Sequence, residues 1–214
     1  MDELRQGRDD PLGPVRLILS DLGGVVVRID PARCHRCWAE LSQRPVDEVA
    51  RLLYPDEVYE AFERGEVSSE RYLAHVRETL GTDIGDAALG DCFNRILLGV
   101  DRDALEVFED QRCQGMRLAA LTNTNELHHR RWSVDYAEEL EVFETIHLSF
   151  ELGARKPEPG CFEKVLEREG LSPGEVVFVD DVPGHVAAAA RLGMSTVHFR
   201  SAEQLERDLT RALT

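Results

Sequence analysis

The chain has 214 residues, of which 43% are hydrophobic and 31% are charged, so it can bury a core in one domain or in a core with an insertion. Its formal net charge of −16, from 41 acidic and 25 basic residues, argues against a nucleic-acid partner, because such binding requires a concentrated basic face. No apolar run approaches the roughly 20 residues that cross a bilayer, and the N-terminal MDELRQGRDD is too charged for a signal peptide, so we expect a cytoplasmic protein with no membrane partner.

The first predicted element is a short buried strand that leads into an aspartate. Residues 1–14 are polar and interrupted by prolines and glycines, so we expect a loose leader there. The apolar run Leu17–Leu19 predicts a strand, which is followed by Asp21 and then by a break at Gly23 and Gly24. Open α/β sheets bind ligands at the carboxyl ends of their strands, and glycine lets a ligand approach the backbone. Asp21 is therefore a candidate reactive group; for this stretch alone, the alternative is a solvated aspartate in an ordinary turn.

Residues 31–100 carry a helical pattern throughout. Asp30 and Pro31 provide an N-cap and a proline at the first helical position. The apolar residues that follow recur at helical spacing, without strand-like alternation. We therefore expect a small helical bundle at 31–100, inserted after the first strand between two core segments at 15–30 and 101–214.

The five cysteines are odd in number and no export signal is present, so we do not expect a disulfide framework. Cys34 and Cys37 form a C-x-x-C, a spacing found in zinc and redox sites. They also share one helical stripe with Trp38 and Leu41, and no second C-x-x-C completes a zinc site. The pattern favours a packing role.

From residue 101 the pattern alternates between helix and strand. A helix over 103–114 precedes Gly115, a suitable C-cap. Further helical segments separate and follow four predicted strands, at Met116–Leu121, Thr145–Leu148, Glu175–Val179 and Thr196–Phe199. This rhythm predicts an α/β fold, with a Rossmann-like parallel sheet core that has helices on both faces.

Polar residues follow the predicted strands, and parallel strands bring such ends to one edge of a sheet. One carboxylate there can attack phosphorus, while a hydroxyl and backbone N–H groups hold phosphate oxygens. A lysine can balance their charge, and further carboxylates can hold Mg²⁺. The residues in question are Asp21, Thr122 with Asn123, Lys156, and Asp180 with Asp181.

These motifs occur as the blocks DLGGVVV, LTNTN, ARKPEP and VVFVDDVPGHVAAAARLGM. In this order they resemble the signature of the haloacid dehalogenase-like hydrolase superfamily over about residues 15–199, and the helical insert matches that superfamily's first type of cap domain. Within it, the same blocks, together with ERGEVS at 63–68 and LSFELGARKPEP, are most similar to α-glucose-1-phosphate phosphatase-like members.

The resemblance implies a role for each matching residue. Asp21 would attack phosphorus and form an aspartyl-phosphate. Thr122 and the backbone of Asn123 would hold the phosphoryl oxygens, and Lys156 would fix both the phosphate and the nucleophile. Taken singly, Thr122 also fits a helix N-cap, and Lys156 fits a surface lysine.

The resemblance also implies a Mg²⁺ cofactor. Its ligands would be Asp21, the backbone carbonyl of Gly23, and Asp181, with Asp180 binding directly or supporting the site. We favour Asp181 over Asp180 as the direct ligand. Such a cation would offset locally the repulsion between a phosphorylated substrate and this acidic chain.

Two residues depart from the family pattern. Gly23 stands where most phosphatases of the family have the aspartate that protonates the leaving oxygen, work typically worth roughly 10²- to 10⁴-fold in rate. Its loss matters least for a good leaving group such as a sugar anomeric oxygen. His185 replaces the usual Asn or Asp and could orient the metal ligands or Lys156, or carry a proton. We favour the simpler interpretation that His185 is an ordinary residue in the first turn of a helix.

Residues of the insert should select the substrate. Glu63, Arg64 and Trp38 are candidates to face the site, although Arg64 also fits a solvated helix end. The adjacent His128 and His129 point in different directions on a helix, so we do not expect them to share a metal.

The sequence thus predicts a Mg²⁺-dependent phosphatase acting on a small phosphorylated metabolite, with a sugar phosphate such as a sugar 1-phosphate as the expected substrate. One alternative is a haloacid dehalogenase, a branch that lacks the second aspartate and does not require the metal. Another is a catalytically impaired binding or regulatory protein, because Gly23 replaces the usual acid. The oligomeric state is not predicted.

Overall fold

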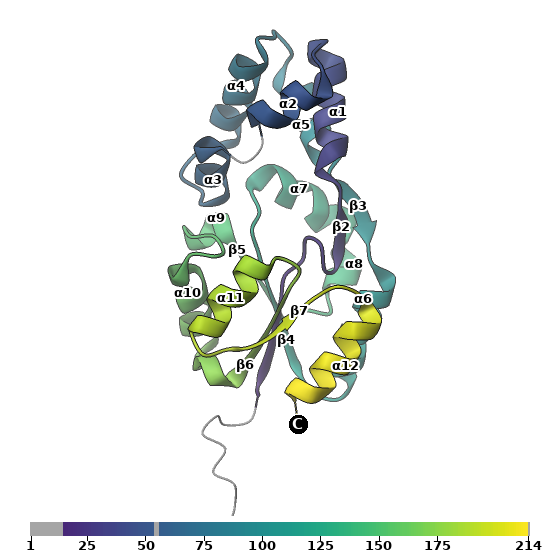
Figure 1. Ribbon diagram of the computed structural model, residues 1–214, viewed down its shortest axis with the longest axis vertical. Coiled ribbons are helices and arrows are strands. Elements are labelled where there is room, and N and C mark those ends of the chain that lie inside the picture. The colour runs from purple at the N-terminus through teal and green to yellow at the C-terminus, as the bar shows by residue number, and fades with distance from the viewer. Residues whose placement is uncertain (1–14, 54–55, 214) are drawn as a thin grey trace, which may run out of the picture.

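The molecule has two parts, a parallel sheet with flanking helices and a helical bundle (Figure 1). The computed structural model describes residues 15–53 and 56–213, so the predicted leader lies outside the described residues. The sheet has the strand order β5-β4-β1-β6-β7, and every pairing in it is parallel. Its strands are β1 (Leu17–Ser20), β4 (Arg117–Thr122), β5 (Thr145–Leu148), β6 (Val176–Asp180) and β7 (Ser195–His198). The predicted Rossmann-like parallel sheet is confirmed.

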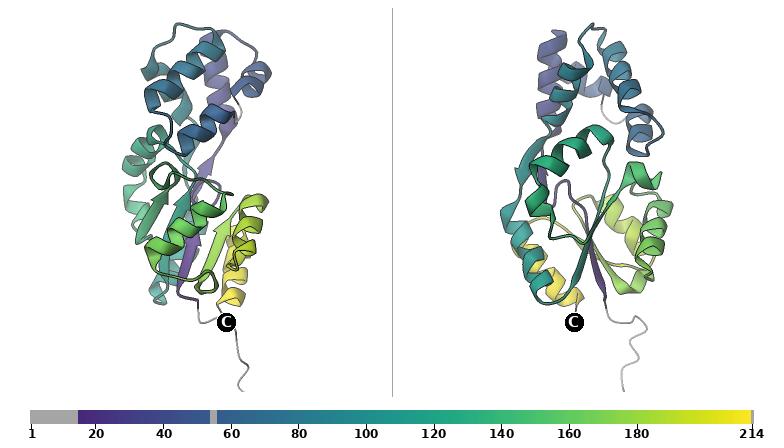
Figure 2. Two further views of the ribbon diagram at one scale, coloured as in Figure 1. Left: turned by 90° about the vertical axis from the view of Figure 1, so that its left-hand side faces the viewer. Right: turned by 180° about the vertical axis from the view of Figure 1, so that it is seen from behind.

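Alternate strand residues pack on opposite faces of this sheet, as the two-residue period of a strand requires. Ile18 lies in one buried cluster and its neighbour Leu19 in the other. Figure 2 shows helices on both sides of the sheet, as predicted. One face packs against α6 (Arg102–Cys113) and α12 (Ala202–Ala212), and the other against α10 (Pro159–Glu169) and α11 (Pro183–Arg191). The remaining helical elements of the core are α7 (Glu126–Asp135), α8 (Ala137–Leu140), α9 (Ser149–Leu152) and a 3₁₀ turn, η1 (Pro173–Glu175).

The helical insert has an apolar core of its own. The Asp30 carboxylate accepts a hydrogen bond from the backbone N–H of Ala32 and caps the first helix, which begins at Pro31 as predicted. Trp38 and Phe93 stack with ring centroids 5.7 Å apart inside the bundle. Its helices are α1 (Pro31–Ser42), α2 (Val46–Leu53), α3 (Glu57–Glu63), α4 (Ser69–Leu80) and α5 (Asp86–Asn94). Among the described residues, no helix is long and apolar enough to cross a membrane.

The helical pattern predicted up to residue 100 is wrong at its end. Residues 97–100 form strand β3 (Leu97–Val100), which pairs antiparallel with β2 (Val27–Ile29). The sequence LLGV has no alternation, and Gly99 has a φ of 108°, a conformation that glycine adopts without strain. The strand is specified by a partner about 70 residues earlier in the chain, which no local pattern reveals. This ribbon carries the chain into and out of the insert.

The expectation about the cysteines is partly wrong. Cys37 forms a disulfide with Cys92, because α1 and α5 pack side by side and bring the two Cα atoms to 5.4 Å. Cys34 is a buried free thiol, in agreement with a packing role. Trp38 shares the buried stripe, but Leu41 is exposed.

Candidate active site

The polar residues that follow the central strands meet at one edge of the sheet. The backbone N–H of Asp21 continues the β1–β6 ladder by donating to the carbonyl of Val179 at 2.8 Å. Lys156 reaches the same point, with its Nζ 2.9 Å from Oδ2 of Asp21 and 2.7 Å from Oδ2 of Asp180. Lys156 is fully buried, so the alternative of a surface lysine is wrong. The convergence expected from parallel strand ends is therefore present.

Asn123 braces this lysine through its side chain, a contact that the sequence analysis did not identify. Its Nδ2 donates to the carbonyl of Lys156 at 2.9 Å, and its Oδ1 accepts from the N–H of Lys156 at 2.8 Å. The loop after β4 is thereby tied to the loop between α9 and α10. Thr122, the last residue of β4, lines the cavity above Asp21.

The glycines after Asp21 lie in a tight loop. The carbonyl of Leu22 accepts hydrogen bonds from the N–H groups of three residues, at 25, 26 and 27. Gly24 has a φ of 84°, and a Cβ there would lie 2.3 Å from Oδ2 of Asp181. At Gly23 a Cβ would meet only Ile29, at an ordinary 3.6 Å. The backbone conformation therefore requires glycine at position 24. At position 23 it does not, and the effect of glycine there is that no side chain can donate a proton.

Four charged groups share a space from which water is largely excluded. Burial raises the pKa of Asp21 above its ordinary value; the Lys156 ammonium opposes this shift, and the carboxylates of Asp180 and Asp181 add to it. Burial also acts to raise the pKa of Asp180, but Lys156 and His185 hold it below its ordinary value. The pKa of Lys156 is raised, because the attraction of Asp21 and Asp180 outweighs its burial. The site thus holds three carboxylates, on Asp21, Asp180 and Asp181, close to the single ammonium group of Lys156.

The donor set fits a divalent cation. Asp21, Asp180 and His185 bring ligand atoms within 4.8 Å of one another, and Asp181 lines the same cavity. Three carboxylates face one buried cation, Lys156, and oxygen is the ligand that Mg²⁺ prefers. Asp180 is held by Lys156 and His185 and does not line the cavity, whereas Asp181 does. The choice of Asp181 over Asp180 as the direct ligand stays a prediction.

His185 does more than occupy the first turn of α11. Its Nδ1 lies 3.0 Å from Oδ1 of Asp180, which also accepts from the N–H of Val182 at 2.8 Å. Because an ionised carboxylate only accepts hydrogen bonds, Nδ1 carries the proton. The simpler interpretation from the sequence is incomplete, since His185 orients Asp180.

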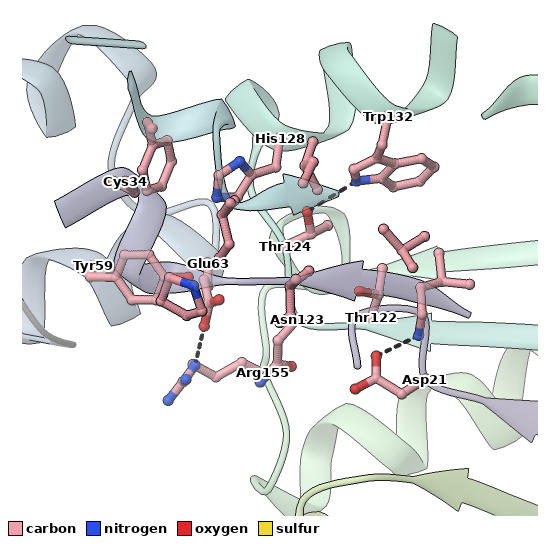
Figure 3. Close-up of a pocket in the computed structure, with 18 of the residues that line it drawn as sticks. Asp21, Cys34, Tyr59, Glu63, Thr122, Asn123, Thr124, His128, Trp132 and Arg155 are labelled. Carbon is pink, nitrogen blue, oxygen red and sulfur yellow. Dashed lines mark hydrogen bonds and ion pairs between the residues drawn. The ribbon is translucent and has the colours of Figure 1, made fainter. Parts of the chain in front are cut away.

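A cavity of about 330 Å³ lies between this edge of the sheet and the helical insert. Figure 3 shows Asp21 and Thr122 at one end of it and Tyr59 and Glu63 at the other. Of the predicted insert residues, Trp38 and Glu63 line the cavity. Arg64 is not among the lining residues and instead forms an ion pair with Glu158 at 3.1 Å.

Arg155 of the core forms ion pairs with the insert at the wall of the cavity, and these contacts were not predicted from the sequence. Nε of Arg155 lies 2.7 Å from Oε2 of Glu63, and Nη1 of Arg155 lies 3.0 Å from Oε1 of Glu60. Burial raises the pKa of Glu63, while Arg155 and the Tyr59 hydroxyl act to lower it. No sequence signal separates Arg155 from other arginines, because its partners lie more than 90 residues earlier.

His128 lines the cavity as a neutral imidazole. Its ring stacks on Phe93 at 4.0 Å between centroids, and burial lowers its pKa to about 3. Nδ1 lies 3.0 Å from Oδ1 of Asn94, an acceptor, so Nδ1 carries the hydrogen. The neighbouring His129 packs on other residues, Trp132 and Phe150, as expected for side chains that point in different directions.

Comparison with known proteins places this geometry in a family. The sequence pattern of the haloacid dehalogenase-like hydrolases matches residues 15–193. The chain is 22% identical over 202 residues to the D-ribitol-5-phosphate phosphatase of Bacteroides thetaiotaomicron, covering 92% of this chain and 97% of that protein. It is 27% identical over 181 residues to a sesquiterpene phosphatase of Aspergillus oryzae, covering 84% and 87%.

A solved structure gives the same result. A HAD family enzyme from Bacteroides thetaiotaomicron, crystallised in complex with magnesium and inorganic phosphate, superposes with a TM-score of 0.77 at 26% identity, covering 87% of this chain and 94% of that one. The closer resemblance to α-glucose-1-phosphate phosphatases stays a prediction. The family match spans every strand-end residue discussed above, from Asp21 to Asp181. The chain therefore belongs to the haloacid dehalogenase-like hydrolases.

Proposed function

We propose that this protein is a Mg²⁺-dependent phosphatase that hydrolyses a small phosphorylated metabolite through an aspartyl-phosphate on Asp21. The observation that carries the proposal is the contact of one buried lysine, Lys156, with both Asp21 and Asp180 at the floor of a cavity. The names of the two relatives and the magnesium and phosphate complex of the structural neighbour support it.

The reaction assigns one task to each residue. An oxygen of Asp21 attacks phosphorus, the bond from phosphorus to the leaving oxygen breaks, and water later cleaves the acyl phosphate. Thr122 and the backbone N–H of Asn123 hold phosphoryl oxygens, and Lys156 holds Asp21 and balances the charge that develops. Mg²⁺, when bound by Asp21, Asp181 and the carbonyl of Gly23, with Asp180 in support, supplies positive charge that favours the ionised form of Asp21.

Gly23 restricts the leaving group. It has no side chain that could protonate the departing oxygen, so the reaction depends on an alcohol that leaves readily or on another proton donor. A sugar 1-phosphate releases such an alcohol, because its anomeric oxygen is a good leaving group. This class of substrate stays a prediction. The two relatives act, by their names, on a sugar alcohol phosphate and on a sesquiterpene phosphate, so they do not decide between a polar and an apolar leaving group.

The proposal is tested by phosphate release from p-nitrophenyl phosphate and from a panel of sugar phosphates, with Mg²⁺ and with EDTA. We expect release that requires Mg²⁺ and is lost in Asp21→Asn, a change that keeps the size of the side chain but removes the nucleophile. Halide release from 2-chloropropionate without metal would instead indicate the dehalogenase reaction. No release of either product by the folded wild-type protein would support the catalytically impaired alternative.

A further inference from the structure

We infer that the cavity beneath the helical insert binds a compact hydrocarbon or aromatic leaving group, in place of the sugar expected from the sequence. This inference rests on the proposed phosphatase reaction and concerns the part of the substrate that departs from phosphorus. It would make the insert a selector for apolar alcohol phosphates.

The lining of the cavity carries the inference. Apart from the polar floor formed by the strand ends, most of its walls are apolar, and several of the side chains that form them are aromatic. Burying apolar surface is favourable roughly in proportion to its area, so a hydrocarbon gains by entering this space. The side chains that form these walls include Trp38, Tyr59, Tyr72, Phe93, Ile96 and Leu97.

Three polar groups of the walls, on Trp38, Tyr59 and Glu63, are already engaged within the protein. Trp38 Nε1 donates to the carbonyl of Leu89 at 3.0 Å. Glu63 is paired with Arg155, and the Tyr59 hydroxyl hydrogen-bonds to Glu63. A sugar brings several hydroxyls, and each one that is buried without a partner costs free energy. The walls therefore discriminate against a sugar and in favour of a hydrocarbon of the same shape.

One nitrogen behind the wall has no hydrogen-bond partner within the described part of the protein. Among the described residues, Nε2 of His128 is one of two buried side-chain nitrogen or oxygen atoms without a hydrogen-bond partner, the other being Nδ2 of Asn125. The His128 ring extends from α7 towards the side of the cavity where Cys34 and Tyr59 lie (Figure 3).

The size of the cavity limits the leaving group. The cavity of about 330 Å³ must hold the phosphoryl group at its polar floor as well as the leaving group. It therefore favours a compact alcohol, such as a six-membered carbocycle or a short branched chain.

The test compares cyclohexylmethyl phosphate with glucose 6-phosphate, in the presence of Mg²⁺. Both place a six-membered ring on a CH₂–O–P linkage, so they differ mainly in hydroxyl groups. We expect kcat/KM to be at least tenfold higher for cyclohexylmethyl phosphate, since differences of this order follow from one or two methylene contacts in an apolar pocket. Calorimetric titration of Asp21→Asn with the two intact esters should give the same ranking without turnover.

Two serine substitutions provide a matched pair. Ile96 lines the cavity, whereas Leu98, two residues further along, is 37% exposed and is not among the lining residues. Ile96→Ser should reduce the preference for cyclohexylmethyl phosphate by at least threefold, and Leu98→Ser should leave the preference unchanged. An equal loss in both variants would overturn the assignment of this wall.

The outcomes separate the inference from the proposed function. Equal or faster hydrolysis of glucose 6-phosphate would overturn the apolar leaving group while leaving the phosphatase reaction intact. Absence of phosphate release from every ester, p-nitrophenyl phosphate included, would refute the phosphatase reaction and the inference with it. Tighter binding of the sugar ester by Asp21→Asn would contradict the inference whatever the turnover.

Discussion

The adjacent glycines Gly23 and Gly24 have different roles in the site. Gly24 adopts a left-handed φ of 84° with the carboxylate of Asp181 against it, so a side chain there would be strained and would displace an acid of the site. Gly23 has no such constraint, and its surroundings leave room for a side chain. The missing acid at position 23 is therefore a difference in chemistry that the fold does not impose.

Gly23→Asp should restore proton transfer to the leaving oxygen. We expect kcat for an alkyl phosphate to rise roughly 10- to 100-fold, towards the range typical of general acid catalysis. For p-nitrophenyl phosphate, whose leaving group departs without a proton, the step that releases p-nitrophenol should change little. The initial burst of p-nitrophenol and the steady-state rates for both esters, measured across pH 5–8, check this expectation.

Gly24→Ala provides the control at the neighbouring position. It should abolish activity on both esters, because the new methyl group collides with Asp181. A similar loss of activity in Gly23→Asp would contradict the assignment of space at position 23. Circular dichroism of both variants separates a local effect from unfolding.

The attachment of helix α3 to the core decides how the insert sits above the site. Arg155, just before Lys156, pairs with Glu60 and Glu63 of α3. Arg64, at the end of α3, pairs with Glu158 of the core, so here the insert supplies the arginine and the core the glutamate. The first contact includes a buried carboxylate, while the second lies at a partly exposed edge.

Arg155→Met should destabilise the protein much more than Arg64→Met. The first change leaves Glu63 buried without its cation, which typically costs about 3 kcal/mol. The second removes solvent-screened ion pairs with Glu60, Glu66 and Glu158, each worth at most about 1 kcal/mol. Urea unfolding monitored by circular dichroism gives both values, and a Glu63→Gln change in the Arg155→Met background should recover part of the loss. Equal destabilisation by the two arginine changes would show that the burial of Glu63 is not decisive.

At the scale of the whole molecule, the net charge of −16 acts on any anionic substrate. Lys156 and a bound cation act only at short range, while the acidic surface repels a phosphate ester during its approach. Salt shortens the reach of this field, from a Debye length of roughly 30 Å at 0.01 M to roughly 8 Å at 0.15 M.

We therefore expect kcat/KM for a phosphate ester to rise by about two- to fivefold between 20 and 150 mM NaCl at saturating Mg²⁺. Initial rates well below KM measure this directly, and the same series in KCl controls for effects of the particular cation. A steady fall with salt would show that a local positive field, and not the net charge, governs the encounter.

Local sequence was sufficient for the elements and for part of the site. Apolar runs and glycine breaks predicted the strands of the parallel sheet, and Asp30 with Pro31 predicted the start of α1. Asp21 and Lys156 were found because each follows a strand, and parallel topology brings such residues to one edge. The roles of these residues in catalysis and metal binding stay predictions.

The contacts that the sequence missed join segments remote from one another. β3 depends on pairing with β2, Cys37 meets Cys92 only because α1 and α5 are neighbours, and Arg155 finds Glu63 across the cavity. Periodicity and turn residues act locally, so most helices, the strands of the parallel sheet and the polar residues that end them could be predicted from the sequence. Which side chains face each other across the insert, and hence how apolar the cavity is, could not be predicted, because those distances are set by packing between elements far apart in the chain.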